Sequence, residues 1–192
     1  MSTLTYLLTC GAANVWFVVL KIVNVLIMTR TNLSRVKERT HMTAPDEKTL
    51  TALTRLFEEE FGPIGDRQVL YVHAPGRSEI SGNHTDHEGG HVIAGSLDVA
   101  VDGIAVATDS NKVRVADEGY PTFEITLDTL DVQESEKGTS ASLVRGMAHE
   151  VAALGVEPKG FDFAFTCSVP SGGGLSSSAA VEAAYGRAME TL

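Results

Sequence analysis

The sequence predicts an α+β fold, in which strands and helices are segregated along the chain. Three observations support this prediction. Strand-like segments are concentrated between residues 68 and 127, two of the three helix-like segments follow them, and no regular alternation of strand and helix indicates βαβ units. The 192 residues suffice for one sizeable domain with an appended segment, and they contain no internal repeat or low-complexity tract.

The composition excludes one broad class of partner. The formal net charge is −10, whereas nucleic-acid binding requires a basic surface, so we expect no nucleic-acid partner. The two cysteines, Cys10 and Cys167, lie far apart in the sequence and form neither a disulfide framework nor a zinc motif. This usage favours a reducing cytoplasm, and we expect a cytoplasmic protein.

Residues 1–41 differ from the rest of the chain. Residues 4–28 are mostly apolar and are long enough to span a bilayer. Lys21 counts against a membrane span, because a lysine near the bilayer centre costs roughly 3 kcal/mol. If the run did insert, the basic residues between 30 and 39 would leave the remainder on the cytoplasmic side. We interpret residues 1–41 as an apolar N-terminal segment that either inserts into a membrane or lies outside the folded unit, and residues 42–192 as the folded domain.

A helix is predicted at the start of this domain. The stretch Thr43–Asp46 supplies a capping residue, an early proline and an acid in the first turn. Apolar residues recur at helical spacing from Leu50 to Phe61, and Gly62–Pro63 ends the run. Residues 68–74 then predict a strand, and residues 75–90 a long polar loop.

The remaining elements follow from periodicity and turn residues. Strands are expected in the segments that are apolar or that alternate between apolar and polar residues, namely 92–94, 99–108, 113–116 and 122–127. A turn at residues 119–121 precedes the last of these, and an irregular acidic stretch at 130–139 follows it. A second helix is expected from 143 to 154, closed by Gly155. The apolar run 161–169 predicts a buried strand, and residues 181–185 predict a further helix.

The stretch Pro170–Ala180 is the most informative part of the chain. Three consecutive glycines allow the backbone to take positive φ and to approach a ligand closely. The serines that follow stand where a helix would begin, with free N–H groups and the positive end of the helix dipole, and this combination binds anions, above all phosphate. The motif GxxxxGK[ST] is absent from the sequence, which excludes an ordinary P-loop. A flexible Gly/Ser linker is the plainer alternative, but a buried strand and an alanine-rich helix seldom flank a linker.

A second stretch, Ala74–His91, concentrates polar side chains directly after a predicted strand. It contains an arginine, three histidines, three acids and four glycines. Its histidines do not have the HExxH arrangement, and the glycines oppose the helix on which histidines three or four apart would share a face, so metal ligation is the less favoured interpretation. A merely solvated loop is another. The mixture of carboxylates, amide and imidazole is best suited to a polyhydroxylated ligand, and Arg77 would place fixed positive charge beside a reacting phosphate.

Together the two stretches resemble a known family. Ala74–Arg77 followed by Gly82–Asp86 resembles the galactokinase signature, and Pro170–Ala180 resembles the phosphate-binding motif of the wider GHMP kinases. The resemblance runs from about residue 47 to the end of the chain. It implies a GHMP-kinase N-terminal domain, in which a mixed sheet packs against helices. One residue departs from the pattern, because most galactokinases carry a glutamate where this chain has Asn83.

The resemblance also implies a role for each matching residue. Arg77 would be catalytic, lying by the anomeric hydroxyl of the sugar and the γ-phosphate, while Asn83, His84 and Asp86 would hold hydroxyl groups of galactose. Ser177 would coordinate Mg²⁺. The residues that would cradle the phosphates of ATP are Gly172, Gly173, Gly174, Leu175, Ser176, Ser177 and Ser178. The implied reaction transfers the γ-phosphate of ATP to the anomeric hydroxyl of galactose and gives galactose 1-phosphate and ADP.

Galactokinases place a catalytic aspartate, a second Mg²⁺ ligand and a whole second domain after the phosphate loop. The resemblance therefore implies that the C-terminal domain lies beyond Leu192 and is absent from this chain, so that the chain would turn over little substrate on its own. Two alternatives stay open: a non-catalytic sensor of galactose and ATP, and a GHMP kinase that acts on another small alcohol or an amino sugar.

Overall fold

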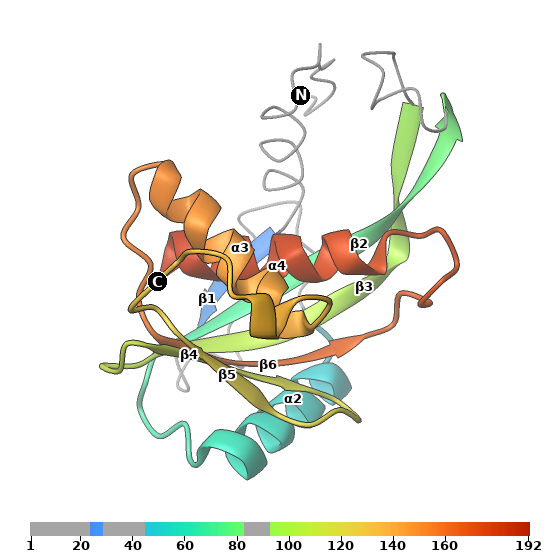
Figure 1. Cartoon of the computed structure of the whole chain (residues 1–192). Coiled ribbons are helices and arrows are strands. Elements are labelled where there is room, and N and C mark those ends of the chain that lie inside the picture. Colours follow the sequence, from blue (N-terminus) through green and yellow to red (C-terminus); the bar gives the residue numbers. More distant parts are fainter. Residues whose placement is uncertain (1–23, 29–44, 83–92) are drawn as a thin grey trace.

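The fold is described by a computed structural model of residues 24–28, 45–82 and 93–192 (Figure 1). In chain order, its elements are β1 (Asn24–Met28), α2 (Glu47–Phe61), β2 (Val69–Ser81), β3 (Ile93–Ala107), β4 (Lys112–Asp117), β5 (Phe123–Thr126), the 3₁₀ turn η3 (Glu134–Glu136), α3 (Ser140–Ala153), β6 (Phe161–Cys167) and α4 (Ser177–Thr191).

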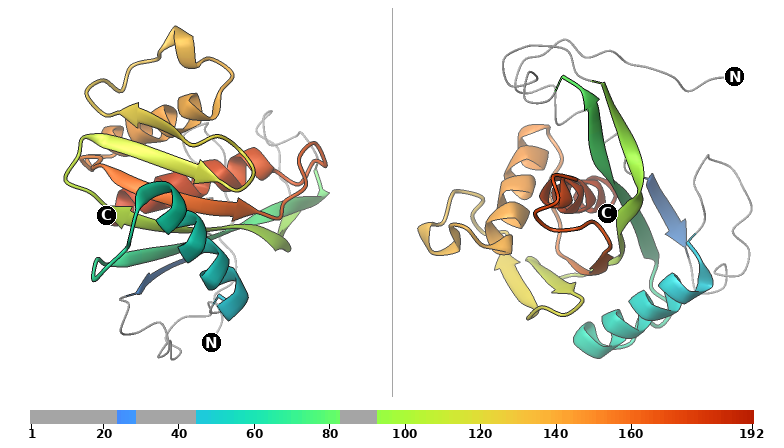
Figure 2. Two further views of the ribbon diagram at one scale, coloured as in Figure 1. Left: turned by 90° about the horizontal axis from the view of Figure 1, so that it is seen from below. Right: turned by 90° about the vertical axis from the view of Figure 1, so that its right-hand side faces the viewer.

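The strands form one mixed sheet with the order β1-β2-β3-β6-β4-β5. Every neighbouring pair is antiparallel except β4 and β6, which run parallel. Helices α3 and α4 cover one face of the sheet and α2 covers the other (Figure 2). The predicted α+β class is confirmed, since the sheet is mixed and its helices are not crossovers of successive parallel strands.

Strand β6 shows how the residue pattern builds the two cores. Phe161, Phe163 and Phe165 alternate with smaller residues and pack against α3 and α4, while Ala164 belongs to the core beneath α2. On the neighbouring β3, Gly103 leaves room for these rings, because a Cβ atom built on it would lie 2.5 Å from Cζ of Phe163. The central sheet is therefore buried on both faces.

Helix α2 ends before Gly62 as predicted, but it begins at Glu47, later than the predicted start. Asp46 is its N-cap and accepts a hydrogen bond from the backbone N–H of Thr49 at 2.8 Å, and Gly62 at the C-cap has φ +85°. The sequence places Asp46 inside the first turn; it is instead the capping residue. Leu53 and Phe57 bury the inner face of the helix.

A charged pair lies on the same face of the sheet as α2. Asp162 is 1% exposed and accepts two hydrogen bonds from Arg114, each 2.6 Å long. The guanidinium of Arg114 also lies 5.0 Å from the ring centroid of Phe61. The buried carboxylate is therefore both neutralised and hydrogen-bonded, as a buried charge requires.

Two predicted boundaries in the centre of the sheet are wrong. Residues 75–81, expected in a polar loop, continue β2, and β3 is one continuous strand from Ile93 rather than two short ones. Pro75 and Gly76 usually end a strand, but here the pairing with β3 shifts register between Pro75 and Arg77. This irregularity accommodates the proline and lets the hairpin continue.

The expected boundary of the folded unit at residue 42 also needs correction. Residues 24–28, part of the apolar N-terminal segment, form β1 and pair antiparallel with residues 69–73 of β2. Backbone pairing with an otherwise open sheet edge explains why these five residues join the fold. The rest of the segment lies outside the described residues. Among the helices that are described, none is long and apolar enough to cross a membrane.

Candidate active site

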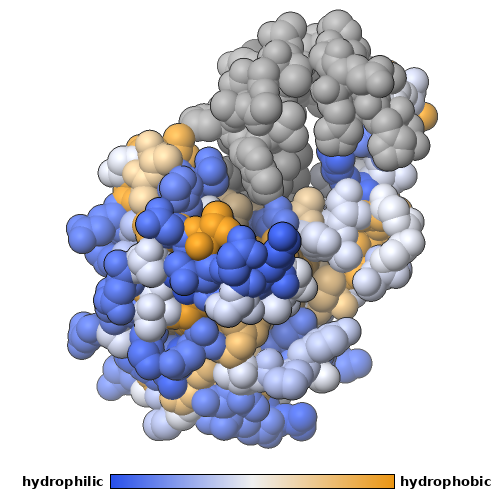
Figure 3. All heavy atoms as spheres, in the orientation of Figure 1, coloured by the Kyte–Doolittle hydropathy of each residue, from blue (hydrophilic) through white to orange (hydrophobic). Residues whose placement is uncertain are grey.

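The predicted phosphate loop connects β6 to α4 and is exposed at its glycines. Gly172 and Gly174 have φ values of +72° and +70°, in the left-handed region that glycine adopts without strain. Ser176 has φ +62° and is the one residue other than glycine with positive φ in the described part of the chain. Figure 3 shows pale surface of intermediate hydropathy at the right-hand side, where this loop lies in Figure 1.

The loop leads directly into the first turn of α4. The helix starts at Ser177, four residues earlier than the predicted run at 181, and its first hydrogen bond joins Ala180 N–H to Ser176 O at 3.0 Å. The N–H groups of Ser177, Ser178 and Ala179 have no acceptor among the described residues. These donors and the positive end of the helix dipole form a site suited to an anion.

Arg77 lies against this loop, although nearly a hundred residues separate them in the sequence. Its backbone N–H donates to Leu175 O at 3.1 Å, and its side-chain Nε donates to Ser176 Oγ at 3.2 Å. Its Nη2 lies 3.1 Å from Oε1 of Glu79. The structure thus brings the predicted catalytic arginine and the predicted phosphate loop into direct contact.

Two further contacts hold the base of the loop. A Cβ atom on Gly76 would lie 3.0 Å from Leu175 O and 3.1 Å from a methyl carbon of Val169, so only glycine allows β2 to approach this closely. On the other side, Ser168 Oγ accepts from Ala100 N–H at 2.9 Å and donates to Ala100 O at 3.0 Å. The loop is therefore fastened to both β2 and β3.

Acidic groups with raised pKa values lie near the same end of the sheet. Asp117 ends β4, the parallel neighbour of β6, and burial, reinforced by the charge of Glu118, raises its pKa to about 6. Glu182, in the second turn of α4, also has a raised pKa because of burial. Burial likewise raises the pKa of the Cys167 thiol, which disfavours a nucleophilic thiolate.

The other predicted site residues divide into two groups. Gly172, Gly173 and Gly174 lie together in the loop, with Leu175, Ser176, Ser177 and Ser178 leading into α4. Asn83, His84 and Asp86 lie outside the described residues, which stop at Gly82 and resume at Ile93. Sequence reasoning gave Glu79 no role; in the structure it lies in β2 two residues after Arg77, on the same face of the strand, and pairs with it.

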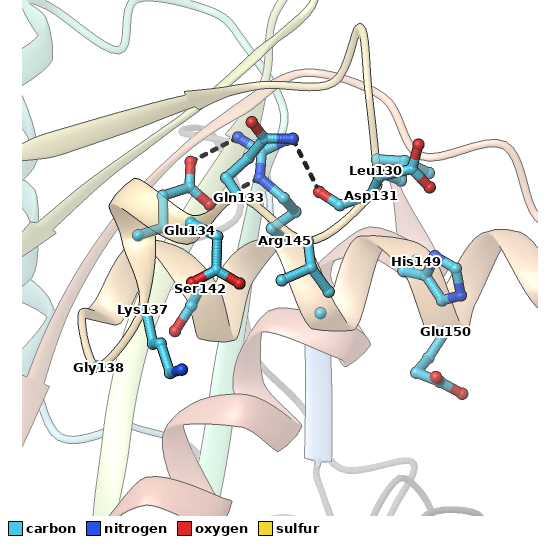
Figure 4. Close-up of a pocket in the computed structure, with 13 residues that line it drawn as sticks. Leu130, Asp131, Gln133, Glu134, Lys137, Gly138, Ser142, Arg145, His149 and Glu150 are labelled. Carbon is cyan, nitrogen blue, oxygen red and sulfur yellow. Dashed lines mark hydrogen bonds and ion pairs between the residues drawn. The ribbon is translucent and has the colours of Figure 1, made fainter.

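A separate pocket of about 520 Å³ opens between η3 and α3 (Figure 4). Arg145 lines it and is 5% exposed; its guanidinium binds both carboxylate oxygens of Glu136, at 2.7 and 2.6 Å, and the carbonyl oxygens of Thr126 and Thr129. Hydrogen bonds from Arg145 lower the pKa of the Glu136 carboxyl. Because the protein itself satisfies this cation, Arg145 anchors the β5–α3 connection rather than offering charge to a ligand.

The described residues contain no group of three or more histidine, cysteine, aspartate or glutamate side chains placed to hold a metal ion.

Two family models match the two stretches that form this site. Residues 55–106 match the galactokinase galactose-binding signature, and residues 142–192 match the N-terminal domain of the GHMP kinases. The galactokinase of Lactococcus lactis subsp. cremoris is 34% identical over 145 residues, which cover 74% of this chain and 36% of that protein. The galactokinase of Bacillus subtilis is 30% identical over 131 residues, or 67% of this chain and 34% of that protein.

Solved structures agree with these matches. The crystal structure of Lactococcus lactis galactokinase complexed with galactose aligns with a TM-score of 0.63 and 34% identity, covering 69% of this chain and 34% of that one. The mevalonate kinase of Methanococcus jannaschii aligns with a TM-score of 0.54 at 17% identity, which shows a shared fold alone. The chain spans about a third of the length of the curated relatives that it matches.

Proposed function

The chain matches the N-terminal portion of the galactokinases, within the GHMP kinases, and on this premise we propose that it binds ATP and galactose for transfer of the γ-phosphate to the anomeric hydroxyl of the sugar. The observation that carries the proposal is the contact of Arg77 with Leu175 and Ser176. This contact supports the proposal, because a permanent positive charge beside a loop suited to an anion would favour the binding of phosphate.

The loop would bind the phosphates of ATP through its backbone. The exposed glycines allow close approach, and the free N–H groups of residues 177–179 supply donors that point at an anion. Ser177 Oγ would help to hold Mg²⁺, which would neutralise the charge of the phosphates. Neutralisation matters for this protein, because its net charge of −10 otherwise repels a nucleotide.

Arg77 would act on the reacting groups. In the transfer, the anomeric oxygen forms a bond to the γ-phosphorus, the bond from that phosphorus to the bridging oxygen of ADP breaks, and the hydroxyl proton leaves to a base. Such reactions depend mainly on alignment and charge stabilisation. The Nε–H of Arg77 is held by Ser176, so the guanidinium is oriented before substrates arrive. We assign Asn83, His84 and Asp86 to hydroxyl groups of galactose. A reaction that consumes ATP also favours a cytoplasmic location.

Calorimetric titration of the chain with MgATP and with galactose tests the proposal. We expect both to bind. We expect Ser177→Ala to weaken the binding of MgATP by about fivefold or more, because one metal ligand is lost. Ser140→Ala is the matched control, because Ser140 is the first residue of α3 as Ser177 is of α4. Failure of the chain to bind either substrate would overturn the proposal.

Competition and turnover distinguish the alternatives. Displacement by homoserine, mevalonate or N-acetylgalactosamine in preference to galactose would point to another GHMP kinase. Binding of both substrates without release of ADP, in a hybrid that joins the chain to the remaining part of a matched galactokinase, would point to a non-catalytic sensor.

A further inference from the structure

Glu79, in β2, has a carboxylate group of which only one oxygen atom has a partner in the protein. Its Oε1 lies 3.1 Å from Nη2 of Arg77, and its side chain is 15% exposed. Its Oε2 is buried and has no hydrogen-bond partner, and within the described residues no other side-chain oxygen is in this situation. Buried acceptors are almost always paired, so an orphaned carboxylate oxygen calls for an explanation.

Glu79 lies close to the residues proposed to bind the reacting groups. Glu79 and Arg77 are two residues apart in one strand and point to the same face. Arg77 in turn donates from Nε to Ser176 of the phosphate loop. The guanidinium therefore lies between the loop on one side and the carboxylate on the other.

The negative charge of Glu79 favours binding of galactose over binding of ATP at this carboxylate. A carboxylate repels the phosphates of ATP, whereas it accepts short, strong hydrogen bonds from the hydroxyl groups of a neutral sugar. Arg77 neutralises the carboxylate through Oε1 and leaves Oε2 as an acceptor. A hydrogen bond from a neutral hydroxyl group to Oε2 would satisfy the orphaned oxygen without adding charge beside Arg77.

We propose that Glu79 is a sugar-binding residue, whose Oε2 accepts a hydrogen bond from a hydroxyl group of galactose. The inference rests on the proposed function, since it requires galactose to bind beside Arg77. It assigns to the site a carboxylate that the sequence motifs did not single out.

The test compares the galactose affinity of the chain with that of Glu79→Gln, measured by calorimetry. A hydrogen bond to a charged group typically changes binding by about tenfold or more, so the Kd for galactose should rise by about that factor while the Kd for MgATP stays unchanged. Glu124→Gln is the matched control, because Glu124 is also a strand glutamate paired with a cation, at 2.6 Å from Lys112, but is exposed and in β5.

A panel of monodeoxy galactoses separates direct contact from an effect through Arg77. If Glu79 binds a hydroxyl, one analogue should bind wild type and Glu79→Gln equally, because the contacted group is already missing. An equal penalty for galactose and for every analogue would show that Glu79 acts only by positioning Arg77, and would overturn the inference.

The possible failures are distinguishable. If the wild-type chain does not bind galactose, the proposed function fails. If it binds galactose and Glu79→Gln binds it equally well, only the role of Glu79 fails. Circular dichroism verifies folding, and Glu79→Asp, which keeps the charge but shortens the reach, replaces the glutamine variant if that variant is unfolded.

Discussion

Gly76 is the residue through which β2 touches the phosphate loop, and Gly76→Ala tests this contact. A Cβ at this position would lie 3.0 Å from Leu175 O and 3.1 and 3.3 Å from the two methyl carbons of Val169. The methyl groups can adjust slightly, but Leu175 O is a backbone atom. The strand or the loop must therefore retreat by a few tenths of an ångström.

The magnitude follows from two terms. Overpacking a closely packed site costs about 1–3 kcal/mol, and we expect the free energy of unfolding to fall within this range. The same displacement lengthens the hydrogen bond from Arg77 N–H to Leu175 O, now 3.1 Å. That hydrogen bond contributes about 1 kcal/mol, so a displaced loop should weaken the binding of MgATP by about fivefold.

Urea unfolding followed by circular dichroism measures the first effect, and calorimetric titration with MgATP measures the second. Gly95→Ala is the control, because Gly95 lies in the same hairpin and its Cβ would meet only Cδ1 of Ile80, at 3.9 Å. If Gly76→Ala matched wild type in both stability and nucleotide affinity, the close approach of β2 to the loop would be refuted.

Three further substitutions test the core and its charges. Asp162→Asn should lower the free energy of unfolding, measured in urea titrations, by about 2 kcal/mol. This loss is smaller than that expected for a fully buried ion pair, because Arg114 is 37% exposed. A decrease in the free energy of unfolding no larger than that caused by Glu124→Gln would refute this prediction. Gly103→Ala should lower the melting temperature by several degrees, because its Cβ would lie 2.5 Å from Phe163; an unchanged melting curve would contradict the packing. Asp117 has a pKa raised from 3.8 to about 6, so the folded state holds a proton that the unfolded state releases, and stability should fall as pH rises from about 4 to 6. Asp117→Asn should flatten this slope in unfolding measured at several pH values, and an unaltered slope would exclude Asp117 as its source.

Local signals predicted the elements whose ends are set by local chemistry. Helix α2 is bounded by Asp46 and Gly62, and both act through side-chain or backbone geometry within one turn. The glycines before α4 likewise carry the positive φ values that a tight loop requires. The class of the fold was predictable from these signals, and the two motifs predicted the matches to the galactokinase and GHMP-kinase models.

Boundaries set by distant partners were not predictable in the same way. Pro75 and Gly76 end strands in most contexts, but pairing with β3 carries β2 on to Ser81. Residues 24–28 were grouped with an apolar segment because nothing local shows that β2 has an open edge for them. Tertiary pairing overrides local preference at both places.

The unpaired oxygen of Glu79 also lay beyond sequence reasoning. Its spacing from Arg77 shows that the two can meet, but only the packed strand shows that one carboxylate oxygen is used and the other is buried without a partner. A sequence can therefore indicate which residues share a face of a strand. Which of their polar atoms have hydrogen-bond partners depends on the residues that pack over that face.

The register of β3 explains why two distant motifs meet. Ala74 of β2 and Cys167 of β6 both pair with Val101, so they stand in one row across the sheet. Both strands are antiparallel to β3 and therefore leave this row in the same direction, β2 toward Arg77 and β6 toward the glycine loop. A slip of one residue in either pairing would turn the side chains of that strand to the opposite face. The contact of Arg77 with Ser176 thus depends on the pairing of the central strand with both of its neighbours.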